Sequence, residues 1–76
     1  MTYYLCVVND RHTDLGFSLF EDLDDALKHM YAIERLYPYA EREQKPPTGW
    51  DYSCTYSGEG DHGYIEKVVL NNKATP

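Results

Sequence analysis

The side chains of this 76-residue chain that could do chemistry are its three histidines, two cysteines and a few serines. A metal site needs three or four converging nitrogen, oxygen or sulfur ligands, yet the sequence has neither a Cys-x-x-Cys nor a His-x-x-x-His spacing. His12 and His62 lie beside acids in loop-like segments, which is typical of exposed histidines. No serine or cysteine lies in a recognised nucleophile motif. We therefore predict no metal, no cofactor and no enzyme activity.

The two cysteines, Cys6 and Cys54, lie within strand-like segments, so we expect them to be core residues. Near Met1 there is neither a basic segment nor a long apolar run, which are the marks of a secretory leader. Thiols of cytoplasmic proteins stay reduced. We therefore expect a cytoplasmic protein with both cysteines unbridged. Because no apolar run approaches transmembrane length, we also expect no membrane association.

Acidic side chains are the other candidate functional groups. The sequence has 13 aspartates and glutamates against 7 lysines and arginines, which gives a formal net charge of −6. Nucleic-acid binders draw their affinity mainly from cations on phosphates, so this balance argues against direct nucleic-acid binding and against an anionic membrane. An acidic surface suits a protein partner with a basic surface, or it serves solubility alone.

The acids gather at the start of a predicted helix and in the glycine-rich segment 57–63. Helix capping and a solvated surface would explain several of them. The functional alternative is an acidic face that competes for the cationic groove of a nucleic-acid-handling protein, with exposed tyrosines as anchors. The candidate partner-binding residues are Glu21, Asp24, Asp25, Glu59, Asp61 and Tyr56.

Residues 21–38 predict the helix, which is the only one that the sequence indicates. Asp22 suits the N-cap, and Pro38 disfavours helical geometry at Tyr37 and so ends the helix. Glu34 falls within the apolar stripe, so either the helix frays there or Glu34 reaches the rim of the core. The stripe is wide enough to cover a sheet face and consists of Leu23, Ala26, Leu27, Met30, Ile33 and Tyr37.

Strand patterns occupy four segments, 3–8, 16–21, 50–56 and 64–70. Segment 3–8 is apolar throughout, which is typical of a strand covered on both faces. Segment 50–56 alternates aromatic or cysteine residues with polar ones, which predicts one buried face. The three glycines of segment 57–63 then predict a hairpin.

Together these elements predict a single α+β domain over residues 1–70. We expect a small antiparallel β-sheet of three to four strands, in ββαββ or βαββ order, with one helix packed on one face. Leu27 and Met30 are expected to pack on the face that carries Leu5 or Val7.

One helix cannot cover both faces of such a sheet. The uncovered face must be solvated or meet a partner, and a homodimer through this face is one such arrangement. The eight tyrosines suit half-buried faces and interfaces alike. Residues 71–76 are expected to be a disordered tail.

The chain is short and acidic, with an early Tyr-Tyr-Leu-Cys-Val-Val run, a helix opened by Glu-Asp-Leu-Asp-Asp-Ala-Leu and a C-terminal hairpin. In size, layout and charge it resembles small phage-encoded inhibitors, among them anti-CRISPR proteins and phage inhibitors of host polymerase. The resemblance implies a non-enzymatic protein that binds a host complex, such as a CRISPR effector, by occupying a nucleic-acid site. It transfers no residue role. The alternative is a small cytoplasmic accessory or homo-oligomerisation domain whose acidity serves only solubility.

Overall fold

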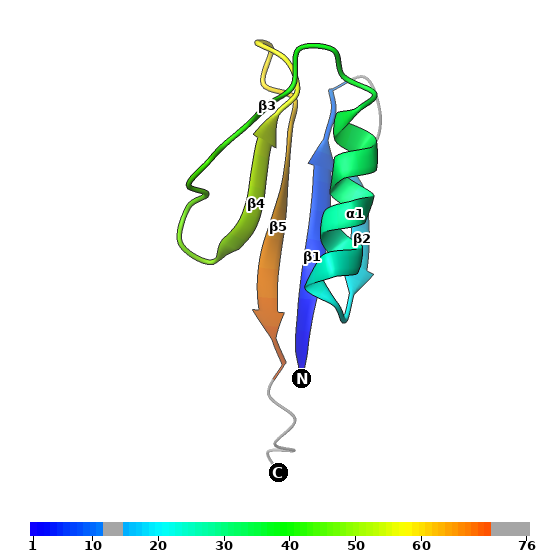
Figure 1. Cartoon of the computed structure of the whole chain (residues 1–76), viewed down its shortest axis with the longest axis vertical. Helices are drawn as coiled ribbons and strands as arrows, with labels where there is room; N and C mark the ends of the chain where they lie inside the picture. The colour runs from blue at the N-terminus through cyan, green and yellow to red at the C-terminus, as the bar shows by residue number, and fades with distance from the viewer. Residues whose placement is uncertain (12–14, 71–76) are drawn as a thin grey trace.

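One antiparallel sheet of five strands, in the order β2-β1-β5-β4-β3, carries the single helix of the described residues on one face (Figure 1). The computed structural model describes residues 1–11 and 15–70, so His12 and the predicted tail 71–76 lie outside the described residues. The predicted α+β fold is confirmed, and a two-residue strand after the helix makes the order ββαβββ. The elements are β1 Thr2–Asn9, β2 Gly16–Phe20, α1 Leu23–Glu34, β3 Glu41–Arg42, β4 Trp50–Thr55 and β5 His62–Val69.

The apolar segment near the start of the chain forms β1, which pairs with β2 on one side and with β5 on the other. The predicted hairpin is formed by β4 and β5, and the Tyr56 amide closes it by donating to the Asp61 carbonyl at 2.8 Å. Gly60 in this turn has a φ of 98°, which glycine adopts without strain. The pairing of β5 with β4 therefore starts directly after the turn, at His62 opposite Thr55.

The helix α1 begins as predicted and ends earlier than predicted. The Asp22 carboxylate accepts a hydrogen bond from the Asp24 amide at 3.0 Å and caps the first turn. The last helical residue is Glu34, which reaches the rim of the core, and the chain continues toward Pro38 in tighter turns. Among the described residues, no helix is long and apolar enough to cross a membrane.

The core lies between α1 and the sheet face that carries Cys6. The Cys6 thiol lies beneath the helix and donates a weak hydrogen bond to the Ala26 carbonyl at 3.8 Å. Half-buried side chains of α1 and of the flanking strands close the core at its margins. The buried members of this cluster are Cys6, Ala26, Met30, Tyr52, Cys54, Tyr56 and Ile65.

The expectation that Leu27 and Met30 pack on the face of Leu5 or Val7 is wrong. Successive side chains of a strand point to opposite faces, so the burial of Cys6 under α1 turns Leu5 and Val7 to the other side. The sequence could not decide this, because segment 3–8 is apolar on both faces and a strand with two apolar faces does not indicate which one meets the helix.

Candidate binding surfaces

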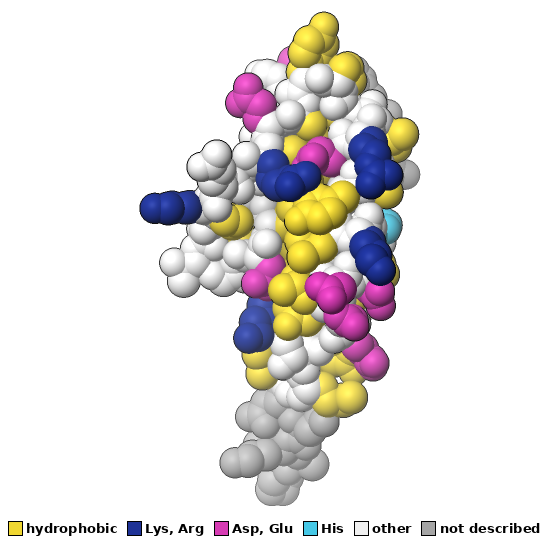
Figure 2. Space-filling view, viewed as in Figure 1, with side chains coloured by type: hydrophobic (Ala, Val, Ile, Leu, Met, Phe, Trp, Pro, Cys, Tyr) yellow, Lys and Arg dark blue, Asp and Glu magenta, His cyan; other side chains and the backbone are white. Residues whose placement is uncertain are grey.

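The acidic helix start, which we define as Glu21, Asp22, Asp24 and Asp25, is exposed as predicted. The end of β2 at Phe20 and the Asp22 cap fix its backbone. Acidic side chains gather over this part of the molecule in Figure 2. Within the part of the chain that the structure describes, none of the four carboxylates is in an ion pair. The cap uses Asp22, whereas no side-chain hydrogen bond or ion pair is seen for the other three carboxylates over the described residues.

The predicted acids of the β4–β5 turn do not join this surface, because the turn lies at the opposite end of the molecule (Figure 1). Glu59 is exposed and forms an ion pair with Arg11 at 3.1 Å. Asp61 is 5% exposed, which corrects its predicted role on the surface. Its carboxylate accepts hydrogen bonds from the Arg11 amide at 3.0 Å and the Ser57 hydroxyl at 2.9 Å. Asp61 therefore ties the turn to the segment that follows β1.

Tyr56, predicted as an exposed anchor, is instead a core residue that is 2% exposed. Its ring stacks on that of Tyr37, with ring centroids 4.4 Å apart. Its buried hydroxyl has no hydrogen-bond partner among the described residues. The alternation of segment 50–56 places Tyr56 on the same face as Tyr52 and Cys54, and α1 covers that face.

A cluster that the sequence did not predict joins the end of α1 to β3 and β4. Arg42 donates to both carboxylate oxygens of Glu34, at 3.0 and 2.8 Å, and its guanidinium lies 4.2 Å from the centre of the Tyr31 ring. The Tyr52 hydroxyl donates to Glu34 Oε1 at 2.7 Å. The hydrogen bonds from Arg42 lower the pKa of Glu34, although desolvation opposes them. An acid within an apolar stripe was the sequence signal for this cluster.

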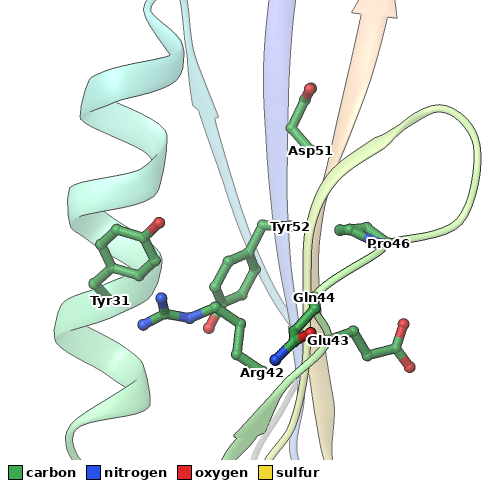
Figure 3. Close-up of a pocket in the computed structure, with 7 residues that line it drawn as sticks. All are labelled: Tyr31, Arg42, Glu43, Gln44, Pro46, Asp51 and Tyr52. Carbon is green, nitrogen blue, oxygen red and sulfur yellow. The ribbon is translucent and has the colours of Figure 1, made fainter.

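An open groove of about 520 Å³ lies beside this cluster, between α1, β4 and the loop that follows β3 (Figure 3). In the close-up, Arg42 lies between Tyr31 and Tyr52, and Glu43 points away. Because Glu34 binds Arg42 with both oxygens, the charge of this guanidinium is already paired, which weakens its attraction for an anionic ligand. The lining consists of Tyr31, Arg42, Glu43, Gln44, Pro46, Asp51 and Tyr52. We assign no ligand to this groove.

The thiols and imidazoles of the described residues are not gathered into a reactive site. Cys6 and Cys54 are both free and buried, as predicted, and burial raises the pKa of Cys6 to about 11. His29 packs against the Phe20 ring at 5.2 Å between centroids, and His62 contacts a carbonyl of its own turn. Over residues 1–11 and 15–70, no group of three or more His, Cys, Asp or Glu side chains could hold a metal ion.

The sheet face opposite α1, which we call the helix-free face, is the second candidate surface. The strand register places Val7 between Phe17 of β2 and Tyr64 of β5, and it pairs Leu5 with Leu19. Phe17 is 62% exposed and Leu19 is 57% exposed. An antiparallel sheet that faces water usually presents polar side chains on that side. Large apolar side chains occupy it here.

Comparisons of the chain with protein-family models, with curated proteins and with solved structures each gave no match. The two candidate surfaces therefore stand on the geometry and charge of this chain's own residues.

Proposed function

We propose that this chain is a non-enzymatic binding protein that docks its acidic helix start on a basic surface of a protein partner. The supporting observation is that Glu21, Asp24 and Asp25 are exposed at one capped helix end, with no ion pair to them among the described residues. Opposite charges across an interface steer the encounter and fix its register. Because the cap holds the backbone of this end, little conformational freedom is lost when a partner binds.

The partner that we propose is a nucleic-acid-handling complex, which the chain inhibits by occupying a phosphate-binding groove. Such a groove is lined by lysines and arginines that neutralise phosphates, and the acidic helix start presents carboxylates in their place. The net charge of −6 attracts the chain to such a groove over distances of a Debye length. The resemblance of the chain to small phage-encoded inhibitors agrees with this partner.

The state of the nucleophiles supports a binder rather than an enzyme. The thiols of Cys6 and Cys54 are buried, and desolvation raises the pKa of each, so both are protonated near neutral pH. A reactive cysteine needs the opposite, a lowered pKa and partial exposure. In the groove beside Tyr31, Arg42 is held by Glu34 and is not directed at a substrate.

Two matched charge reversals test the proposal. Glu21→Lys with Asp24→Lys changes the acidic helix start. Glu43→Lys with Asp51→Lys makes the same change in charge at exposed positions on the loop after β3 and on β4. Each immobilised variant is offered the heparin-binding fraction of a bacterial lysate, which is enriched in proteins with basic grooves. Retained complexes are identified, and their binding to DNA or RNA is measured with and without the chain.

We expect the wild type and the control pair to retain the same complex and to displace its nucleic acid. The Glu21 and Asp24 pair should lose at least about tenfold in affinity, because each reversal adds repulsion to a lost attraction. Equal retention by both pairs would show that the acidity serves solubility alone. Retention without displacement of the nucleic acid would contradict inhibition while leaving binding intact.

A further inference from the structure

We infer that the helix-free face is a self-association surface on which a second copy of this chain packs face to face. The helix-free face is separate from the acidic helix start. On it, Phe17 and Leu19 are 62% and 57% exposed and lie side by side with Leu5 and Val7 of the neighbouring strand. Phe17, Leu19 and half-buried Leu5 form an apolar strip over β1 and β2, whereas Val7 is only 3% exposed and adds little open surface.

An aromatic row continues this strip across β5 and β4. The rings of Tyr64 and Trp50 are stacked with centroids 4.1 Å apart and an interplanar angle of 6°. The His62 ring lies nearly parallel to Tyr64 at 6.2 Å. Rings held in place by one another lose little freedom on binding, which favours their use in an interface. The apolar and aromatic surface thus reaches from the β2 edge to β4.

Charge indicates which kind of molecule can cover this face. Among the register-paired residues of β1, β2, β4 and β5, the helix-free face carries one formally charged side chain, that of Glu66. A basic partner therefore finds little to attract it here. Two copies of a chain with a net charge of −6 repel each other, and a nearly uncharged face is where they can approach most closely.

The area of the face matches what a reversible dimer needs. The strands β1, β2, β4 and β5 contain 8, 5, 6 and 8 residues, and each residue rises about 3.4 Å along strands about 4.8 Å apart, so the face covers about 440 Å². Packing two such faces buries about 900 Å² in total, which is the size of a weak, reversible interface. We therefore expect a dimer that depends on concentration.

A two-fold axis gives this packing a defined register. The axis lies between the two faces and runs across the strands at the level of Tyr64 and Val7. It places β5 on β5 of the second copy, with the two strands antiparallel. Glu66 and His62 are each two residues from Tyr64, on opposite sides along β5. Glu66 then faces His62 of the second copy, so the acid meets an imidazole instead of another acid. Phe17, which is at the level of Val7, faces Phe17 of the second copy.

Oligomeric state as a function of concentration tests this inference. Analytical ultracentrifugation between about 5 and 500 µM follows the shift from the monomer mass of 8.9 kDa to twice that value. Phe17→Lys with Leu19→Lys places two cations in the strip. Leu36→Lys is the control, because Leu36 is 76% exposed but lies beyond the end of α1. Circular dichroism checks that each variant is folded.

We expect the wild type and the Leu36 variant to dimerise, and the Phe17 and Leu19 variant to bind its own copy at least about tenfold more weakly. Salt of about 0.5 M should leave the dimer intact or strengthen it, because screening removes the repulsion between acidic copies. Salt has the opposite effect on the proposed docking of the acidic helix start, so the two proposals can fail separately. A wild type that stays monomeric at 500 µM in high salt would overturn the inference.

Cross-linking tests the register of the dimer. Phe17→Cys should be joined to its own copy by a short bismaleimide cross-linker, whereas Leu36→Cys should not. Phe17 faces its own copy across the axis, but packed sheets lie about 10 Å apart, which is too far for a direct disulfide. The two native thiols are buried and do not interfere. Dimers of the Phe17 and Leu19 variant as stable as those of the wild type would place the interface elsewhere and overturn the inference.

Discussion

Glu34 is a charged residue within the apolar stripe of α1, and two residues of the neighbouring strands bind its carboxylate. Arg42 binds both carboxylate oxygens, and Tyr52 donates its hydroxyl to one of them. The Glu34 side chain is 20% exposed, so a carboxylate without partners at this place would cost about 1–3 kcal/mol. The same contacts fasten the end of α1 to β3 and β4.

This ion pair predicts a dependence of stability on pH. Because Arg42 lowers the pKa of Glu34 in the folded state, the pair stabilises the fold above about pH 4.3, the pKa of an unfolded glutamate. That stabilisation is lost as the pH falls through the lower folded-state pKa. We therefore expect the free energy of unfolding in urea to fall more between about pH 7 and pH 3 for the wild type than for Glu34→Gln.

Glu43→Gln is the control for this measurement, because Glu43 is exposed on the loop that follows β3. Its pH dependence should match that of the wild type. If the wild type and Glu34→Gln lost the same free energy on acidification, the Arg42 pair would have no part in stability.

At Gly63, β5 passes close to the side chains beneath α1. A Cβ atom at this position would collide with the Tyr56 hydroxyl and lie 2.9 Å from Cε of Met30. Gly63→Ala should therefore destabilise the fold by about 1–3 kcal/mol, as overpacking of a core does. Gly58→Ala has no atom within 4 Å of its new Cβ and should change the free energy of unfolding by less than about 0.5 kcal/mol. Equal effects in urea unfolding would show that no such contact exists.

The packing of α1 on the sheet predicts a graded series of losses along the helix. Met30 is fully buried, so Met30→Ala should cost about 2–5 kcal/mol. Leu27 is half-buried, and Leu27→Ala should cost less. Leu36→Ala serves as the exposed control, with little change expected. Urea unfolding of the three variants gives the order, and a larger loss at Leu27 than at Met30 would mean that α1 presents a different face.

Local signals predicted most of the elements. Asp22 marked the start of α1, and strict alternation with a glycine-rich turn marked the β4–β5 hairpin. The strand β3 could not be predicted, because Glu41 and Arg42 show no strand pattern and pair only through the end of β4. The face of β1 that meets α1 was also undetermined, since both of its faces are apolar.

The acidic helix start was the part of the candidate site that the sequence could predict, because caps and first-turn acids are local features. The burial of Asp61 depends on the amide of Arg11, which is fifty residues away in the chain. The burial of Tyr56 depends on its stacking with Tyr37 from beyond the helix. Contacts of this range leave no local pattern, so two of the predicted residues were wrongly placed on the surface.

The molecule separates its charged and apolar surfaces. The acidic helix start lies at one end of α1, and the helix-free face lies on the far side of the sheet. The two should act independently, since well-separated sites usually contribute additively. Reversing Glu21 and Asp24 should therefore not weaken the dimer in ultracentrifugation, and the lower net charge should if anything strengthen it. A shared loss would mean that the two surfaces form one interface.

The salt dependence of partner affinity tests docking by the acidic helix start most directly. The dissociation constant of the retained complex would be measured between about 50 and 300 mM salt, for the wild type and for Glu21→Lys with Asp24→Lys. We expect wild-type affinity to fall steeply as salt rises, and the variant to bind weakly with a shallower dependence. Affinity that is indifferent to salt and unchanged by the reversal would contradict docking through these carboxylates.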